Sequence, residues 1–192
     1  MTQIIKGSIS SIATNGDTAL AILNATVALV CDRSSSMNEY TKSRKTRAQL
    51  EDEVVTELQS RYSGKIAVVG FNSSAYLCED GVLPSPTSDT SFGAAFEVAE
   101  ALSDAGLRVI LVSDGEPNEI QYQGGEDQLL TNAKCKFHGN MDCIFVGDEN
   151  SAGERFMQRL AEAVGGSATL CDLNEGSRLL EETIETLLLK AG

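Results

Sequence analysis

The sequence predicts an α/β fold, a doubly wound three-layer sandwich in which helices cover both faces of a mostly parallel sheet. Short apolar runs rich in β-branched residues alternate along the chain with segments whose apolar residues have helical spacing. Three of these runs are followed directly by an aspartate, at Asp32, Asp114 and Asp148. Alternating strands and helices form right-handed βαβ units, and the usual strand order of such a sheet is 3-2-1-4-5-6.

The chain divides into an N-terminal extension, residues 1–24, that we expect to pack on the domain, and the domain itself, residues 25–192. Within the extension, Gly16 and Asp17 precede a segment, 18–23, that can form a short capped helix. Residues 3–13 fit a strand and a helix equally well. The chain is of one-domain length and contains no long linker, so a single core is expected.

Six strands are predicted in the domain, at residues 25–31, 65–71, 75–78, 107–113, 141–147 and 168–173. The third is short and follows a tight Asn-Ser-Ser turn, which favours an antiparallel strand at the edge of the sheet. Helices are predicted at residues 41–62, 90–104, 127–138, 152–164 and 178–190. Glycines at 64, 106 and 165 end three of them, because glycine tolerates the left-handed cap.

The composition excludes several classes of partner. The net charge of −13 opposes binding to nucleic acid or to anionic membrane surfaces. The five cysteines are odd in number and form no CxxC motif, so we expect reduced, buried thiols and a cytoplasmic protein. No apolar run is long enough for a secretory signal or a membrane span.

Oxygen-bearing side chains gather where the predicted strands end. The apolar run at 25–31 leads into Asp32, Ser34 and Ser36, Thr90 opens a helix, and Asp114 follows the fourth strand. The predicted order makes strands 1 and 4 neighbours, so Asp32 and Asp114 should lie above one crevice. An all-oxygen set without histidine or cysteine suits Mg²⁺ and argues against zinc.

These motifs resemble the metal-ion-dependent adhesion site of von Willebrand factor type A (VWA) domains: Asp32-x-Ser34-x-Ser36, then Thr90, then Asp114-Gly115. The segments at 112–117 and 145–166 extend the likeness. The resemblance implies a Rossmann-like domain that binds Mg²⁺, or Mn²⁺ or Ca²⁺ in its place, through Asp32, Ser34, Ser36, Thr90 and Asp114. It also implies that one or both aspartates act through water. The family often has glycine where this chain has Ser35, which puts the shape of the loop in question.

Two functions follow from this reading. The first, implied by the resemblance, is a stand-alone intracellular VWA domain whose bound metal accepts a Glu or Asp side chain of a protein partner. Such domains often work beside AAA-type ATPases or in multiprotein assemblies. The alternative is a Mg²⁺-dependent phosphatase or phosphotransferase with Asp32 as nucleophile. The chain has no DxD motif after Asp32, no GxxxxGKS/T loop and no GxSxG motif. We therefore expect it not to be an enzyme.

Basic residues flank the predicted site. Arg33 lies inside the loop, and Lys42, Arg44, Lys45 and Arg47 follow it. They predict either a positive patch that steers an acidic partner or simply a solvated helix face. Asp148 is expected to cap a turn rather than to bind metal. His138 is expected to complement the C-terminal end of a helix.

Overall fold

The structure is a computed structural model that describes residues 3–115, 117 and 125–191. Its six-stranded sheet has the order β3-β2-β1-β4-β5-β6, and only β3 runs antiparallel to its neighbour. The strands are β1 (Val27–Asp32), β2 (Ile66–Phe71), β3 (Ala75–Leu77), β4 (Arg108–Ser113), β5 (Met141–Phe145) and β6 (Ala168–Leu170). The predicted fold class, the strand order and the antiparallel edge strand are therefore confirmed.

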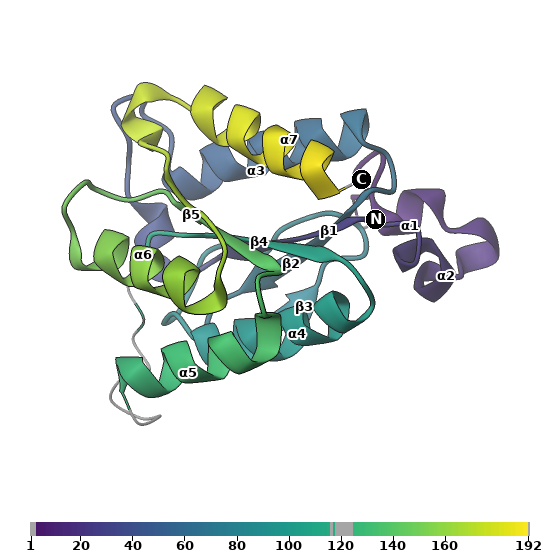
Figure 1. Ribbon diagram of the computed structural model, residues 1–192. Coiled ribbons are helices and arrows are strands. Elements are labelled where there is room, and N and C mark those ends of the chain that lie inside the picture. Colours follow the sequence, from purple (N-terminus) through teal and green to yellow (C-terminus); the bar gives the residue numbers. More distant parts are fainter. Residues whose placement is uncertain (1–2, 116, 118–124, 192) are drawn as a thin grey trace.

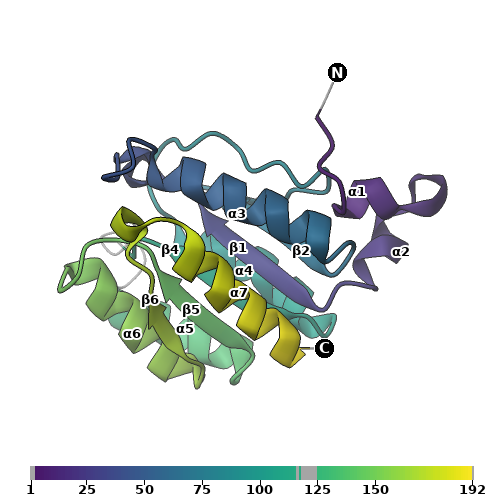
Figure 2. The same ribbon diagram turned by 90° about the horizontal axis from the view of Figure 1, so that it is seen from above.

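Helices cover both faces of the sheet, as Figures 1 and 2 show. One face carries α3 (Arg47–Arg61) and α7 (Arg178–Ala191); the other carries α4 (Phe92–Asp104), α5 (Glu126–Phe137) and α6 (Ala152–Val164). The short helices α1 (Ile9–Ile12) and α2 (Thr18–Ile22) precede β1. Three short 3₁₀ helices complete the described elements: η1 (Thr14–Gly16), η2 (Ser35–Asn38) and η4 (Leu173–Glu175).

The unbroken apolar run of β1 is explained by its position at the centre of the sheet. All six of its residues are buried. Ala28 and Val30 pack in the core shared with α4, α5 and α6, whereas Val27 and Leu29 pack in the core beneath α3 and α7. A parallel strand covered on both faces needs apolar side chains at every position, which is the pattern that identified it.

Helix α3 begins later than the sequence predicted. Thr46 caps it by accepting a hydrogen bond from the Gln49 amide, and the Gln49 side chain accepts one from the Thr46 amide. This capping box fixes the first turn at Arg47. Residues 41–45 instead form a loop, closed by the Thr41 amide donating to the Lys45 carbonyl over 2.8 Å. The prediction that the helix starts at residue 41 was wrong, because the box outweighs the helical spacing.

The N-terminal extension is helical where the sequence left two alternatives open. Residues 9–12 form α1, and Asp17 caps α2 by accepting from the Leu20 amide. The Ile5 amide donates to the Asp80 carbonyl over 2.9 Å, and the Ser10 amide to the Glu79 carbonyl over 2.7 Å. These bonds join the extension to the segment that follows β3.

Four of the five cysteines are buried, as expected, but Cys135 is exposed on α5. The prediction of a buried thiol was wrong there, because the residue lies on the solvent side of an amphipathic helix. Among the described residues, no helix combines the length and apolar character that crossing a membrane requires.

Asp142 on β5 ties three strands together at the end of the sheet remote from the predicted site. Its carboxylate accepts from the Ser167 amide at 2.9 Å, the Ser167 hydroxyl at 2.6 Å and Arg108 Nε at 2.6 Å. Burial opposes ionisation, but the hydrogen bonds from Ser167 and Arg108 outweigh it and lower the pKa of Asp142 below its ordinary 3.8.

We expect Asp142→Asn to lower the free energy of unfolding at pH 7 by about 1.5–3 kcal/mol, because a charged acceptor of several hydrogen bonds is lost. A carboxyl whose pKa is lowered in the fold stabilises it above the unfolded pKa, and this stabilisation is lost as the pH falls. The difference from wild type should therefore shrink below pH 4. Urea unfolding at pH 7 and pH 3 measures it, and a difference that does not change between the two would contradict the assignment.

Candidate metal centre

The Asp32 side chain is held in place by hydrogen bonds to both of its carboxylate oxygens. Asp32 ends β1 and is fully buried. One carboxylate oxygen accepts from the Ser34 amide at 2.8 Å, and the other accepts from the Ser113 hydroxyl at 2.6 Å. The Ser113 hydroxyl in turn accepts from the Gly115 amide at 2.9 Å. Asp32 is thus held by its own loop and by the end of β4. The sequence analysis missed Ser113. It ends the strand predicted to lie beside strand 1, and this position could have indicated a contact with Asp32.

The two serine hydroxyls of the loop converge. Ser34 Oγ and Ser36 Oγ lie 2.9 Å apart, because η2 begins directly after Ser34 and turns the chain. Ser35, at the position where the resemblance leads us to expect glycine, is not among the residues with positive φ. A side chain at this position therefore costs no backbone strain, and the serine is compatible with the loop.

Thr90 is brought toward this loop by hydrogen bonds of the segment that precedes it. The Ser35 amide donates to the Ser88 carbonyl over 3.0 Å, and the Thr87 amide to the Arg33 carbonyl over 2.8 Å. Thr90 itself is buried, next to Ser91, the N-cap of α4. It therefore lies at the carboxyl edge of the sheet together with the loop after β1.

Asp114 follows β4 and is 5% exposed. Its Oδ2 lies 3.4 Å from an Arg47 guanidinium nitrogen. Its Oδ1 is buried, and none of the described residues donates a hydrogen bond to it. A buried carboxylate oxygen without a donor is costly, so a cation or water at this atom would stabilise the site. The neighbouring Glu116, part of the motif at 112–117, lies outside the described residues.

The two aspartates repel each other. Burial raises the pKa of Asp32 to about 6, and the charge of Asp114 adds to the rise, whereas hydrogen bonds from Ser113 and Ser34 oppose it. Two carboxylates facing each other in a region of low dielectric are a favourable environment for a cation.

A pocket of about 100 Å³ opens onto the site. Two of its lining residues, Ser36 and Asp114, belong to the predicted set, and the others are Glu39, Arg47, Gly147, Asp148 and Ser151. Asp148 was expected only to cap a turn; it also lines this pocket and lies 3.6 Å from Arg47. A cation bound here would face the outside through this opening.

The donor chemistry fits a hard cation such as Mg²⁺. Within the part of the chain that the structure describes, no three His, Cys, Asp or Glu side chains form a group that could hold a metal. The predicted set has two carboxylates and three hydroxyls, so an ion here would depend on neutral oxygens and water. Mg²⁺ usually keeps several waters and needs only one or two carboxylates.

The expectation that Arg33 lies at the surface, in a positive patch or on a solvated helix face, was wrong. Its side chain is buried, 3.1 Å from Glu51 and 3.2 Å from Asp52, and its Nε donates to the Pro84 carbonyl at 2.6 Å. Three of the other basic residues are paired with acids: Lys42 with Glu175, Lys45 with Glu53, and Arg47 with Glu39, Asp114 and Asp148. The region is therefore a mixed-charge surface, and the buried Arg33 side chain holds the loop after β1 in place.

His138 is the C-cap of α5 and has the left-handed backbone conformation.

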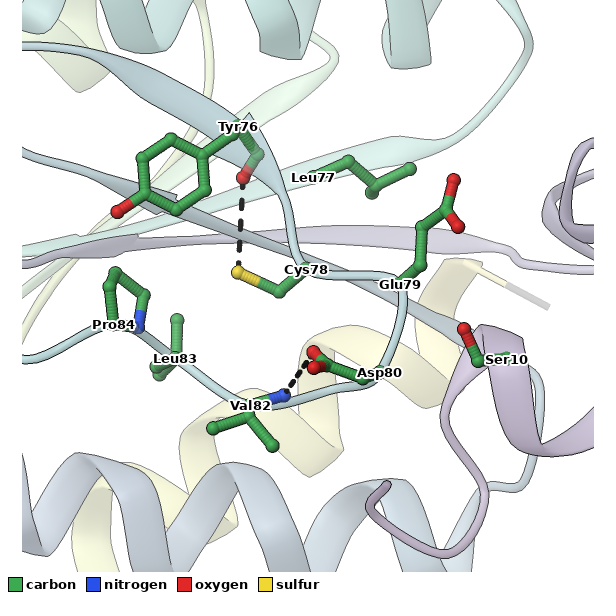
Figure 3. A pocket seen from close by; sticks show the side chains of 9 residues that line it. All are labelled: Ser10, Tyr76, Leu77, Cys78, Glu79, Asp80, Val82, Leu83 and Pro84. Carbon is green, nitrogen blue, oxygen red and sulfur yellow. Dashed lines mark hydrogen bonds between the residues drawn. The ribbon is translucent and has the colours of Figure 1, made fainter. Parts of the chain in front are cut away.

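A larger pocket, of about 520 Å³, lies beside β3 and holds none of the predicted ligands (Figure 3). Asp80 there accepts a hydrogen bond from the Val82 amide, and the Cys78 thiol contacts the Tyr76 carbonyl. Since these polar groups bond to neighbouring backbone, we assign the site to the smaller pocket, where a buried carboxylate oxygen of Asp114 has no donor among the residues that the structure describes.

The fold is similar to that of several solved structures. A VWA structure from Catenulispora acidiphila has a TM-score of 0.62 and 15% identity over 88% of this chain and 42% of that one. An aerotolerance-related membrane protein from Bacteroides fragilis has a TM-score of 0.61 and 16% identity over 86% of this chain and 99% of that one. The VWA domain of SpRpn10 has a TM-score of 0.55 and 13% identity over 84% of this chain and 94% of that one.

No protein-family model matches the sequence, and no curated protein matches it. At these identities the likeness concerns the fold. The chain therefore has the fold of VWA domains, and its chemistry has to be argued from its own residues.

Proposed function

We propose that this chain is a VWA-type interaction domain that binds Mg²⁺ through Asp32, Ser34, Ser36, Thr90 and Asp114 and presents the ion to a Glu or Asp side chain of a partner protein. Mn²⁺ or Ca²⁺ would substitute for Mg²⁺. The observation that carries the proposal is the Oδ1 atom of Asp114, a buried carboxylate oxygen without a donor among the described residues.

The proposed ligands would have different roles at the metal. Asp32, held by Ser34 and Ser113, supplies fixed negative charge behind the ion. The converging hydroxyls of Ser34 and Ser36 would be neutral ligands, which add no further negative charge to that of the two aspartates. When bound, the metal supplies a Lewis-acidic position that a carboxylate from outside can complete. A partner that carries such a carboxylate, alone or within an AAA-type ATPase or other assembly, would dock at the opening lined by Ser36 and Asp114.

The alternative function, phosphoryl transfer with Asp32 as nucleophile, is less favoured. Both carboxylate oxygens of Asp32 already accept hydrogen bonds, and the side chain is fully buried. A nucleophile must itself reach the phosphorus atom of a substrate, whereas Asp32 can act on an ion through a bridging water from its buried position. That the chain is not an enzyme, and that it is cytoplasmic, remain predictions.

Metal binding should stabilise the fold, because the ion binds the native state and the unfolded chain lacks the site. At about 100 times the Kd the gain is about 2.7 kcal/mol, which corresponds to a rise in Tm of about 5–10 °C for a chain of this size. We expect Mn²⁺ and Mg²⁺ to produce this rise in a thermal-unfolding assay, and Asp114→Ala and Ser34→Ala to remove most of it.

Asp104→Asn is the matched control, because Asp104 is exposed and is the last residue of α4, at the opposite end of that helix from Thr90. It should retain the full response to Mn²⁺, and EDTA should reverse the rise in wild type. If wild-type protein gives no rise with either ion, the metal proposal fails. A phosphoesterase activity that depends on Asp32 would favour the enzyme instead.

A further inference from the structure

Arg47 lies beside the candidate metal centre, where it lines the small pocket together with Asp114. It is the first residue of α3, immediately after the Thr46 capping box, and its amide donates to the Glu39 carbonyl over 3.1 Å. Its side chain is only 11% exposed. With its backbone fixed at both the helix and the preceding loop, the guanidinium has a limited region that it can occupy, and that region is the small pocket it shares with Ser36 and Asp114.

The guanidinium contacts three carboxylates of very different exposure. It lies 2.9 Å from Glu39, 3.4 Å from Asp114 and 3.6 Å from Asp148. The side chain of Asp114 is 4% exposed, whereas those of Glu39 and Asp148 are 59% and 74% exposed. Water can therefore stabilise the charges of Glu39 and Asp148, but hardly that of Asp114.

The contact with Asp114 is therefore the one for which Arg47 matters most. Among the described residues, Arg47 is the cationic side chain paired with Asp114. A divalent ion at Asp114 would also stabilise the negative charge of this carboxylate, with twice the charge of the guanidinium. Two cations on one carboxylate repel each other strongly at such distances, so the ion and the guanidinium cannot both hold Asp114 at full strength.

We propose that Arg47 is an internal counter-cation that competes with the divalent metal for Asp114. When the metal binds, the guanidinium moves away from Asp114 and keeps its contacts with Glu39 and Asp148, which already lie within reach. This inference rests on the proposed metal site. It implies that the free protein binds metal less tightly than its ligand set allows, since each ion must first displace the arginine.

The test is a direct measurement of Mn²⁺ affinity, by calorimetry, for wild type, Arg47→Gln and Arg47→Lys. We expect Arg47→Gln to bind Mn²⁺ about fivefold more tightly or better, within the usual range of coupling between two sites. Arg47→Lys keeps a cation at the position and should stay closer to wild type. A role of Arg47 in merely holding the fold together predicts the opposite, because a loosened site binds metal more weakly.

Two controls separate contact competition from other effects of charge. Arg61→Gln removes an arginine from the same helix that also meets three carboxylates, those of Glu57, Glu181 and Glu185, and should leave Mn²⁺ affinity unchanged. At about 0.5 M salt, the long-range effect of the Arg47 charge on Mn²⁺ is largely screened. The gain in Mn²⁺ affinity of Arg47→Gln should therefore persist if the arginine competes by contact. The Tm of metal-free Arg47→Gln should lie below that of wild type, and Mn²⁺ should raise it by more.

The outcomes distinguish this inference from the proposed function. If wild type binds Mn²⁺ and Arg47→Gln binds it equally or more weakly, competition by Arg47 is wrong while the metal site stands. The same holds if the gain disappears at high salt. If no variant binds Mn²⁺, the metal site itself is wrong. Binding by Arg47→Gln alone would support the competition in its strongest form.

Discussion

Replacing Arg33 by methionine is expected to lower the free energy of unfolding at pH 9 by about 3–5 kcal/mol, the usual cost of breaking a buried ion pair from one side. Arg33 is 1% exposed and lies 3.1 Å from Glu51, which is fully buried. Methionine fills much of the same space but leaves Glu51 and the Pro84 carbonyl without the donor that Arg33 now supplies. Oε1 of Glu51 has no hydrogen-bond partner among the described residues, so the carboxylate depends on Oε2, which accepts from Arg33.

The loss should depend on pH. Burial raises the pKa of Glu51 to about 8, and the charge of Arg33 opposes the rise. A carboxyl whose pKa is raised in the fold destabilises it progressively as the pH rises from the unfolded pKa to the folded one. Without Arg33 the pKa of Glu51 rises further, so its destabilising effect continues to a higher pH. The free energies of unfolding of wild type and Arg33→Met should therefore differ more at pH 9 than at pH 6.

Urea unfolding followed by circular dichroism measures both effects. Arg61→Met is the matched control: Arg61 pairs with three carboxylates but its side chain is 40% exposed, so the expected loss of stability is much smaller than for Arg33→Met. Replacing both members of the buried pair, in Arg33→Met with Glu51→Leu, should recover most of the stability. Equal losses for Arg33→Met and Arg61→Met would show that burial does not set the value of these contacts.

The architecture could be predicted because its signals are local. A strand covered on both faces is apolar at every position, so β1 and β4 stand out in the sequence. The strand order is the usual one of doubly wound sheets, and it places Asp32 and Asp114 at the ends of adjacent strands. Elements of three residues, such as β6, are too short for their ends to be read from the pattern.

What the sequence did not reveal are contacts that depend on side chains from distant elements. Glu51 reads as part of the charged face of a helix, yet it is fully buried because Arg33 reaches it from the loop after β1. For the same reason Arg33 was expected at the surface, in a positive patch or on a solvated face, and not in the interior. Arg47 was correctly placed near the site, but its contact with Asp114 depends on the capping box that sets the start of α3. A pattern of charges along a chain does not say which charges meet.

Asp114 is positioned by a close approach of two backbone segments that sequence reasoning also missed. Gly153, in the first turn of α6, packs directly on the segment after β4: a Cβ atom added there would lie 2.1 Å from the Asp114 carbonyl oxygen. Gly115 has φ +75°, and an added Cβ would lie 2.4 Å from the Gly153 carbonyl oxygen. Glycine at both positions lets the helix and the Asp114 segment touch through backbone alone.

Gly153→Ala is therefore expected to weaken Mn²⁺ binding about 10- to 100-fold, the range typical for groups that orient metal ligands. The added methyl group must push the Asp114 carbonyl away, because a backbone atom cannot rotate aside as a side chain does. Overpacking of this kind should also lower the free energy of unfolding by about 1–3 kcal/mol. Calorimetric Mn²⁺ titration and urea unfolding measure the two effects on the same protein.

Gly106→Ala separates the two effects. Gly106 has φ +94°, and no atom lies within 4 Å of an added Cβ. The alanine variant should lose about 1–2 kcal/mol through backbone strain but bind Mn²⁺ like wild type, because Gly106 precedes β4 at the opposite end of the strand from Asp114. If both alanine variants weaken Mn²⁺ binding to the same degree, loss of stability alone explains the effect. If only Gly153→Ala does so, the metal affinity depends on where α6 holds the backbone of Asp114.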